Sequence, residues 1–305
     1  MELTPIFRVT ANGDDVTESL QENMVSLSVV DEEGILSDEL TLEVAGKIKR
    51  PKYGDELRVW LGYEEAGLEF VGLFVVQTTT REKKELLTIK ATATDFGGSL
   101  KVKKTREFSK MSYMDLCSAI ASEHSLDVRC DYAGSFKYIA QSDESDLAFL
   151  MRLAKELNQI FSIKNNTLFF GAKKKEELSY VVEYDECISC SITHTNKTHY
   201  KSVKATYRDT KTNSDKEVVY GDGEPVLNIQ GSFKDDDEAL QKAKARLSRA
   251  NKATITGSIT TPGRVCFAGG SLKLVGSLDD GVYGITRVSH EFSSGGFTTT
   301  IEFEN

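Results

Sequence analysis

The stretch QSDESDLAFLMRLAKELNQIFSIKNNTLFF, residues 141–170, decides the fold because it specifies one helix and one hairpin. Ser142 is predicted to cap the helix, and the acidic residues of 143–146 then lie in its first turn, where the helix dipole favours negative charge. Asn165-Asn166 is typical of a two-residue hairpin turn, because asparagine tolerates positive φ. The predicted apolar stripe of the helix consists of Leu147, Phe149, Leu150, Leu153, Ala154 and Leu157.

A second helix signal precedes this one. Ser112 and Asp115 have the spacing of a capping box, in which a hydroxyl and a carboxylate cover free amide donors. Leu116, Ala119 and Ile120 follow at helical spacing, and short strand-like runs come after them. The sequence therefore predicts a small α+β module over residues 105–174.

The segments on both sides of this module have the alternation of β-strands. Residues 1–104 contain about six short alternating runs separated by turns, which predicts a small barrel or sandwich. Residues 175–305 are predicted to form a second β-rich domain, with a helical segment inserted at about 209–253. The helix in that insertion begins at the acidic run 235–238, and its basic residues follow, as the helix dipole favours.

Composition narrows the functional classes. The chain has 305 residues, of which 39% are hydrophobic and 28% charged, so it can bury a core and is large enough for two or three domains. The net charge of −9 disfavours sequence-independent binding to nucleic acid, which requires a basic face. No apolar run approaches the roughly 18 residues of a membrane span, and the N-terminus lacks the features of a secretion signal. We expect a protein synthesised in the cytoplasm, with reduced thiols, that does not insert into a membrane.

The cluster that most resembles a metal site is Cys187 and Cys190 with His194 and His199. Zinc requires four donors that converge on one point. On a regular strand, residues three apart lie on opposite faces, so the two thiols are not expected to chelate together. We therefore predict no metal site here and a buried Cys190.

Other candidate sites have simpler structural explanations. The acidic residues at 143–146 are better placed for helix capping than for acid–base catalysis, and His124 and His290 stand alone. The basic clusters 101–106 and 173–175 fall where connections are expected, which favours a solvated junction over a nucleic-acid site. We expect no catalytic, cofactor-binding or metal-binding residues, hence no enzyme, and the sequence assigns no partner-interface residues.

Several segments together resemble the late-control-gene-D family, the tail hub proteins of contractile-tailed bacteriophages. Residues 141–154 are similar to that family's run Q-x-x-E-S-D-x-x-F-L-x-R-L-A. The other matching segments are Lys101–Leu126 with Arg106, Asp237–Leu274 with Gly257 and Ala268–Leu272, Tyr283–Ile285, and Pro5–Tyr63 with Ser37-Asp38 and Gly54–Leu57. The resemblance covers nearly the whole chain in order and extends to the N-terminal part of type VI secretion spike proteins.

The resemblance implies two antiparallel β-barrel domains joined by α+β modules, of which three copies form a pseudo-hexameric ring. Such a homotrimer would join the sixfold tail tube to the trimeric central spike, with the tape measure and other baseplate proteins as further partners. It would lie in the virion tail of a contractile bacteriophage, or in a prophage tail-like particle, after assembly in the host bacterial cytoplasm. The alternatives are the hub of a type VI or extracellular injection system, for which an appended needle is expected and not seen before Asn305, and a tail-associated wall-degrading enzyme.

Overall fold

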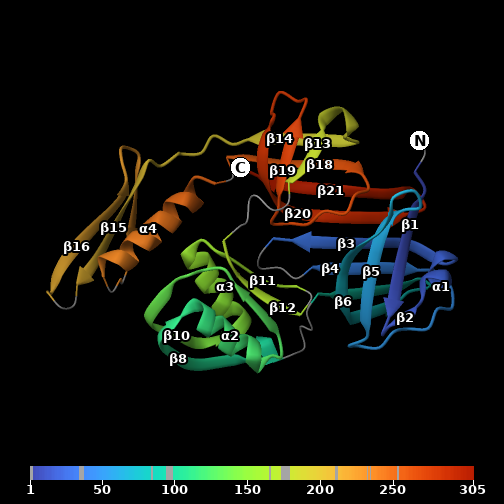
Figure 1. Cartoon of the computed structure of the whole chain (residues 1–305), viewed down its shortest axis with the longest axis horizontal. Coiled ribbons are helices and arrows are strands. Elements are labelled where there is room, and N and C mark those ends of the chain that lie inside the picture. The colour runs from blue at the N-terminus through green and yellow to red at the C-terminus, as the bar shows by residue number, and fades with distance from the viewer. Residues whose placement is uncertain are drawn as a thin grey trace.

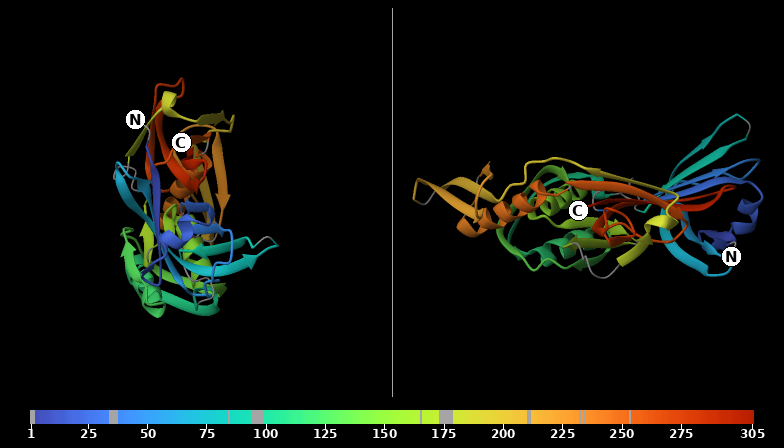
Figure 2. Two further views of the ribbon diagram at one scale, coloured as in Figure 1. Left: turned by 90° about the vertical axis from the view of Figure 1, so that its right-hand side faces the viewer. Right: turned by 90° about the horizontal axis from the view of Figure 1, so that it is seen from above.

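The computed structural model describes residues 3–33, 38–83, 85–93, 99–164, 166–172, 179–209, 212–231, 233, 235–252 and 254–305. Figure 1 shows four bodies along the chain: two β lobes side by side, an α+β module beside them, and a small lobe at the far end. Figure 2 shows that these bodies spread into an elongated molecule. Among the described residues, no helix is both long and apolar enough to cross a bilayer.

The first lobe is formed by the N-terminal strands. Its core consists of the inward side chains of alternating strands, such as Leu27 and Val29 of β3 and Leu40 and Leu42 of β4. A five-residue helix, α1, lies between β2 and β3. It is too short to give the sequence a recognisable helical period. The elements are β1 Pro5–Ala11, β2 Asp14–Asp15, α1 Thr17–Gln21, β3 Met24–Glu32, β4 Glu39–Val44, β5 Glu56–Tyr63, β6 Gly67–Arg81 and β7 Leu87–Thr92.

The second lobe consists of the C-terminal strands together with two strands, β13 and β14, that come before the side lobe in the sequence. Ile301 and Phe303 of β21 and Ile285 of β20 form its buried centre. Phe292 and Phe297 pack instead into the core of the first lobe, so the two lobes share apolar side chains. The elements are β13 Ser179–Glu183, the 3-10 turn Tyr184–Glu186, β14 Ser189–His194, β18 Ile255–Pro262, β19 Ser271–Val275, β20 Gly281–Ser293 and β21 Gly296–Glu304.

One sheet runs through both lobes. Its strand order is β14-β18-β21-β20-β3-β4-β7-β6-β5-β1-β2, and β19 and β13 extend it from β20. The lobes join where β3 and β20 pair antiparallel, from Arg287 opposite Glu32 to Ser293 opposite Ser26. The described strands are therefore mainly antiparallel, as predicted, and their pairing order stays open at β14 and β2.

The α+β module has a core of its own. Helices α2 and α3 pack their apolar faces, including Leu116, Ile120, Phe149 and Leu150, against two small sheets. The hairpin predicted around Asn165-Asn166 is present: β11 and β12 pair up to Lys164 opposite Thr167, although Asn165 itself lies outside the described residues. The elements are the 3-10 turn Ser99–Lys101, β8 Lys103–Ser112, α2 Tyr113–Glu123, β9 Asp127–Cys130, β10 Ser135–Ser145, α3 Asp146–Leu157, β11 Ile160–Lys164 and β12 Thr167–Gly171.

A side lobe contains the inserted helix. Three strands, β15 Ser202–Asp209, β16 Ser214–Gly221 and β17 Val226–Gln230, form a separate sheet in the order β16-β15-β17. Helix α4, Asp236–Ala250, covers one face of this sheet through Ala239 and Ala243. Asp235 caps α4 by accepting a hydrogen bond from the amide of Glu238, which matches the predicted helix start.

Candidate functional site

The carboxylate of Asp146 lies at the centre of the motif formed by residues 141–154. Asp146 is the first residue of α3 and is fully buried. Ser145 is the N-cap and accepts a hydrogen bond from the amide of Ala148, so the prediction that Ser142 caps this helix was wrong. Residues 141–145 still belong to β10, and Asp143 and Glu144 therefore lie outside the first helical turn. Strand and helix meet without a loop, which places Asp146 inside the module.

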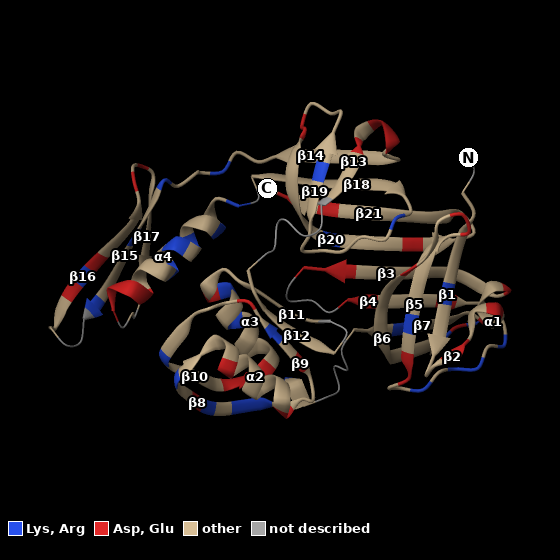
Figure 3. Ribbon diagram, in the orientation of Figure 1, with Lys and Arg blue, Asp and Glu red and all other residues tan. Residues whose placement is uncertain are grey.

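Two basic side chains from β8 reach this buried carboxylate. The Lys104 ammonium donates to Oδ2 of Asp146 at 2.6 Å, and Nη2 of Arg106 donates to Oδ1 at 2.6 Å. The sequence had suggested a solvated connection at residues 101–106, but 103–106 form the first half of β8. Residues two apart on a strand share a face, so β8 aims Lys104 and Arg106 at the same point. Figure 3 shows basic residues along β8 and acidic residues on the helices it packs against.

Gln141 and His124 complete the shell around Asp146. Nε2 of Gln141, which is fully buried, donates to Oδ1 of Asp146 at 2.8 Å, while its Oε1 accepts from Nε of Arg106 at 2.8 Å. The imidazole Nε2 of His124 lies 2.7 Å from Oδ2 of Asp146 and donates to it, because an ionised carboxylate only accepts. The other ring nitrogen lies 2.6 Å from the Ser99 hydroxyl. We call Lys104, Arg106, Glu123, His124, Gln141 and Asp146 the Asp146 network.

Glu123 is the second acid of the network. Its carboxylate accepts from Lys104 at 2.7 Å and from Arg106. Because Glu123 ends α2 and Asp146 begins α3, the two bases of β8 hold both helices in place. The hydrogen bond from Lys104, followed by Arg106, lowers the pKa of Glu123.

The charge balance keeps Asp146 ionised. Burial raises the pKa of Asp146, but hydrogen bonds from Lys104, His124 and Gln141 and the charge of Arg106 outweigh burial and lower the pKa to about 2. Burial likewise lowers the pKa of Lys104, and its hydrogen bonds to Asp146 and Glu123 more than reverse this, so the pKa is raised. Each buried charge therefore has a compensating partner.

The remaining residues of the motif pack around this network. Arg152 donates to Glu144 at 2.6 Å and to the carbonyl of Ala140 at 3.0 Å, which fixes the end of β10 to α3. Its guanidinium lies 5.4 Å from the centre of the Phe149 ring, and Phe149 stacks on Phe108 at 5.6 Å. Leu150, Leu153 and Ala154 are buried in the core. The motif thus describes one interlocked strand–helix junction.

The Asp146 network is suited to structural locking rather than to chemistry. Glu123, His124 and Asp146 have donor atoms within 4.8 Å of one another, a spacing that a metal ion could use. Both oxygens of Asp146, however, already accept two hydrogen bonds each, which accounts for about four acceptor positions on a carboxylate. A cation would have to displace Lys104 and Arg106, and a proton would have to reach a side chain with no solvent access. The arrangement instead joins β8, β10, α2 and α3.

The residues predicted as a possible zinc cluster are spread over the second lobe. The Cys187 thiol donates to the carbonyl of Glu183 at 3.4 Å, and Cys190 lies on β14, half-buried rather than buried as predicted. Nε2 of His194 lies 2.8 Å from a carboxylate oxygen of Asp279, and His199 is exposed. Within the described part of the chain, the group with converging ligand atoms is the one at Asp146. Residues 173–175, the second basic cluster, lie outside the described residues.

Most of the Asp146 network could not be predicted from the sequence. The pattern of residues 141–146 indicates a helix start, and His124 stands alone in the sequence. The available signal was the alternation of Lys104 and Arg106, which is typical of a strand face. Their partner Asp146 lies 40 residues or more downstream, beyond any local pattern.

The comparisons with known proteins agree with this structure. A probable baseplate hub protein of Escherichia phage 186 is 24% identical over 370 residues, which cover 99% of this chain and 93% of that protein. The 43 kDa tail protein of prophage MuSo2 from Shewanella oneidensis has the same fold, with a TM-score of 0.75 and 13% identity over 98% of both chains. The E. coli c3393 protein, a component of the type VI secretion system, superposes with a TM-score of 0.61 and 10% identity over 92% of this chain and 73% of that one.

The family match includes the Asp146 network. Residues 75–296 match the family described as phage tail baseplate hub (GPD), which includes the whole module, the side lobe and most of the second lobe. Residues 101–126 and 141–154, which resemble the hub family in sequence, lie inside this range. The chain therefore belongs to the phage tail baseplate hub (GPD) family.

Proposed function

We propose that this hub protein has a structural role, in which three copies form a ring that joins the sixfold tail tube to the trimeric central spike. The observation that carries the proposal is the pairing of β3 with β20, which fixes two β lobes in one chain. Three chains present six such lobes, so a threefold assembly can offer a nearly sixfold face. In this proposal the two lobes act as the tube-like β-barrel domains, and the module and the side lobe project from them.

The Asp146 network supports a non-enzymatic role. The motif through which the chain resembles hub proteins ends in a buried carboxylate, and that carboxylate is occupied by four hydrogen bonds from Lys104, Arg106, His124 and Gln141. A catalytic acid needs access to its substrate and a pKa near the working pH, whereas Asp146 has no exposed surface and a pKa of about 2. The residues of the motif are used to hold the module together.

The same proposal names the partners and the place of action. The homotrimer contacts the spike on one side and the tail tube on the other, and the tape measure and other baseplate proteins are further neighbours. The protein works in the tail of the virion after assembly in the host bacterial cytoplasm. The proposed division is a first β domain at 1–104, the module at 105–174 and a second β domain at 175–305, with the insertion at about 209–253.

The test is the mass of the full chain in solution. Light scattering on the purified protein, alone and mixed with the spike protein encoded beside its gene, is expected to give a trimer or a three-to-three complex. A monomer that stays a monomer with the spike would remove the ring from the proposal. Release of soluble fragments from peptidoglycan by the pure protein would revive the enzymatic alternative.

The fold shared with the c3393 protein supports a second candidate, a hub of an injection system related to type VI secretion. The two candidates differ in the particle that contains the protein. Purified particles that carry this chain together with a DNA-filled capsid would support the phage tail, and particles that carry it together with an effector protein would support the injection system.

A further inference from the structure

A hollow of about 540 Å³ opens at one end of the first lobe, away from the Asp146 network. Its floor is apolar and is formed by side chains of the lobe's core, with Val16 and Leu20 on the α1 side and Leu42, Leu57 and Ile89 from the strands. The chain segment between β4 and β5 passes over one side of it. The hollow therefore combines an apolar floor with a polar rim, which is the usual composition of a ligand site.

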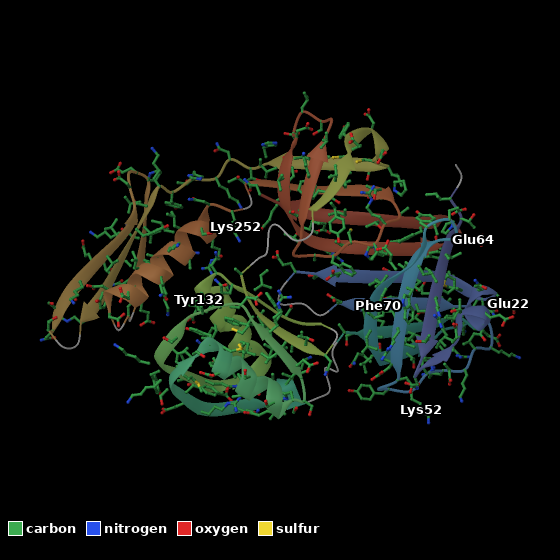
Figure 4. All side chains as sticks on the ribbon, viewed as in Figure 1. Glu22, Lys52, Glu64, Phe70, Tyr132 and Lys252 are labelled. Atoms are coloured by element: carbon green, nitrogen blue, oxygen red, sulfur yellow. The ribbon has the colours of Figure 1, made fainter. Side chains whose placement is uncertain are left out.

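The rim is strongly basic. Residues 47–52 read Lys-Ile-Lys-Arg-Pro-Lys, with four basic side chains and no acidic one, in a chain of net charge −9. Lys47, Lys49, Arg50 and Lys52 are exposed, and Asp55 is the one acidic residue among those that line the hollow. Figure 4 shows Lys52 at the lower edge of the first lobe. We call residues 47–52 the basic loop.

The basic loop is held in one conformation by its neighbours. The Arg81 guanidinium donates to the carbonyl of Ile48, and Nη1 of Arg50 donates to the carbonyl of Thr79 at 3.3 Å. The amide of Lys52 donates to the Asp55 carboxylate at 2.8 Å. Ile48 packs against the core of the lobe, so the apolar and basic residues of the loop are sorted to opposite sides. A loop that is already ordered loses less entropy when it binds a partner.

The nearby acidic groups leave most of this positive charge available. Lys47 reaches Glu85 only at 4.0 Å, with 85% of the lysine side chain exposed. Asp55 accepts hydrogen bonds from the Asn12 side chain at 3.0 Å and from the amide of Lys52. Among the residues that the structure describes, Lys49, Arg50 and Lys52 form no salt bridge within 4.0 Å. Four basic side chains around an apolar floor thus select for a ligand that is both anionic and apolar.

We propose that this hollow docks an acidic segment of a partner protein, whose aliphatic side chain rests on Val16, Leu20 and Leu57 while its carboxylates meet the basic loop. The leucine and isoleucine side chains of the floor are almost fully buried and Val16 is half-buried, so the apolar surface left open is small and suits one or two aliphatic groups rather than a folded domain. A peptide fits this shape, because the hollow continues along the loop and can contact several residues in succession. The proposal is independent of the trimeric ring, since it concerns a single lobe.

The test is binding of a short fluorescein-labelled, glutamate-rich peptide with a central leucine to the full chain, followed by fluorescence anisotropy at low ionic strength. The variant Lys49→Glu with Lys52→Glu reverses two charges of the basic loop. The control variant, Lys155→Glu with Lys244→Glu, makes the same change of net charge on exposed positions of α3 and α4. A second peptide with serine in place of leucine tests the apolar floor.

The basic-loop variant is expected to bind at least about tenfold more weakly than the wild type, and the control variant to bind as the wild type does. The serine peptide is expected to bind several-fold more weakly than the leucine peptide. Equal losses in both variants, equal affinity for both peptides, or no binding of either peptide would overturn the proposal. Binding of the chain to phosphatidylglycerol vesicles without binding to the peptide would assign the hollow to a lipid headgroup and would also overturn it.

Discussion

The carboxylate of Asp146 lies 2.6 Å from the ammonium of Lys104, and the carboxylate has no exposed surface. Lys104 belongs to β8 and Asp146 to α3, so this ion pair connects two elements that are far apart in sequence. A buried ion pair stabilises little by itself, but removal of one partner leaves the other charge uncompensated. Loss of either partner is therefore expected to destabilise the module by more than the small net stabilisation from the intact pair.

Asp146→Asn is expected to destabilise the module by about 3 kcal/mol, because Lys104 and Arg106 lose the buried one of their two shared counter-charges and keep only Glu123. Hydrogen exchange of the α2 and α3 amides should become roughly a hundredfold faster. The single tryptophan, Trp60, lies on β5 and reports on the first lobe, so its fluorescence should not change. Asp143→Asn is the matched control: the Asp143 side chain is 80% exposed and its salt bridge among the described residues is to the exposed Lys103, so an effect below about 1 kcal/mol is expected.

The contribution of Asp146 to the stability of the module depends on pH only in acid. Its pKa is lowered from 3.8 to about 2, so the folded module binds the proton less readily than the unfolded chain does. The stabilisation is therefore complete above about pH 4 and is lost as the pH falls towards 2. The difference in exchange between wild type and Asp146→Asn should stay constant from pH 7 to pH 4 and shrink below it. A difference that shrinks already between pH 7 and pH 5 would contradict the lowered pKa.

His290 should make the second lobe sensitive to mild acid. Its ring is fully buried, with Nε2 3.0 Å from the carbonyl of Cys266 and Nδ1 3.1 Å from the Thr299 hydroxyl. Burial lowers the pKa of His290 from 6.5 to about 4, despite the Cys266 carbonyl and the charge of Asp31, which raise it. The unfolded chain takes up this proton first, so about 3 kcal/mol of stability is present above pH 6.5 and is lost as the pH falls to 4.

The measurement for His290 is the urea midpoint of unfolding at pH 7, 5.5 and 4.5, followed by circular dichroism. His290→Gln keeps a donor near the Cys266 carbonyl and removes the titration, so its midpoint should change less over this range than that of the wild type. Parallel loss of stability in both proteins would show that other groups cause the pH dependence.

Gly257 is required by the ring that lies against it. Gly257 of β18 pairs with Phe303 of β21, and a Cβ at Gly257 would lie 2.3 Å from the tip of the Phe303 ring. Phe303 is buried in the core of the second lobe and has little room to move. Gly257→Ala should therefore cost about 1–3 kcal/mol through overpacking, measured by urea unfolding. At Gly295 a Cβ would meet its nearest atom at 3.5 Å, and Gly295→Ala should change the midpoint little.

The sequence predicted the local elements better than their partners. The capping box at Ser112 is present, with Ser112 and Asp115 bonded in both directions, because all of its atoms lie within one turn. The position of the cap of α3 was predicted three residues too early, because β10 continues through Ser145 to keep its pairing with Lys103. That pairing joins residues more than 40 positions apart, and no periodicity within 141–154 encodes it.

The same reason explains what was missed at larger scale. The alternating runs predicted within residues 1–104 include β3, and the β-rich domain predicted at 175–305 includes β20. Nothing in either strand's sequence indicates that the two strands pair with each other. Val29 and His290 are paired although one lies near the start of the chain and the other near its end. The candidate network could not be predicted because its charged side chains come from three elements, β8, α2 and α3. The family resemblance includes these residues but does not give their contacts.

The junction of β3 and β20 also has a mechanical consequence. Strands that are pulled along their length share the load among all their hydrogen bonds at once, and seven residue pairs connect these two strands. The lobes also share Phe292 and Phe297 in one apolar core, so they resist both sliding and hinging. A force applied to one lobe is therefore transmitted to the other with little deformation between them. Flexibility of this chain should be sought in the connection at residues 195–201, which leads from β14 to β15 of the side lobe.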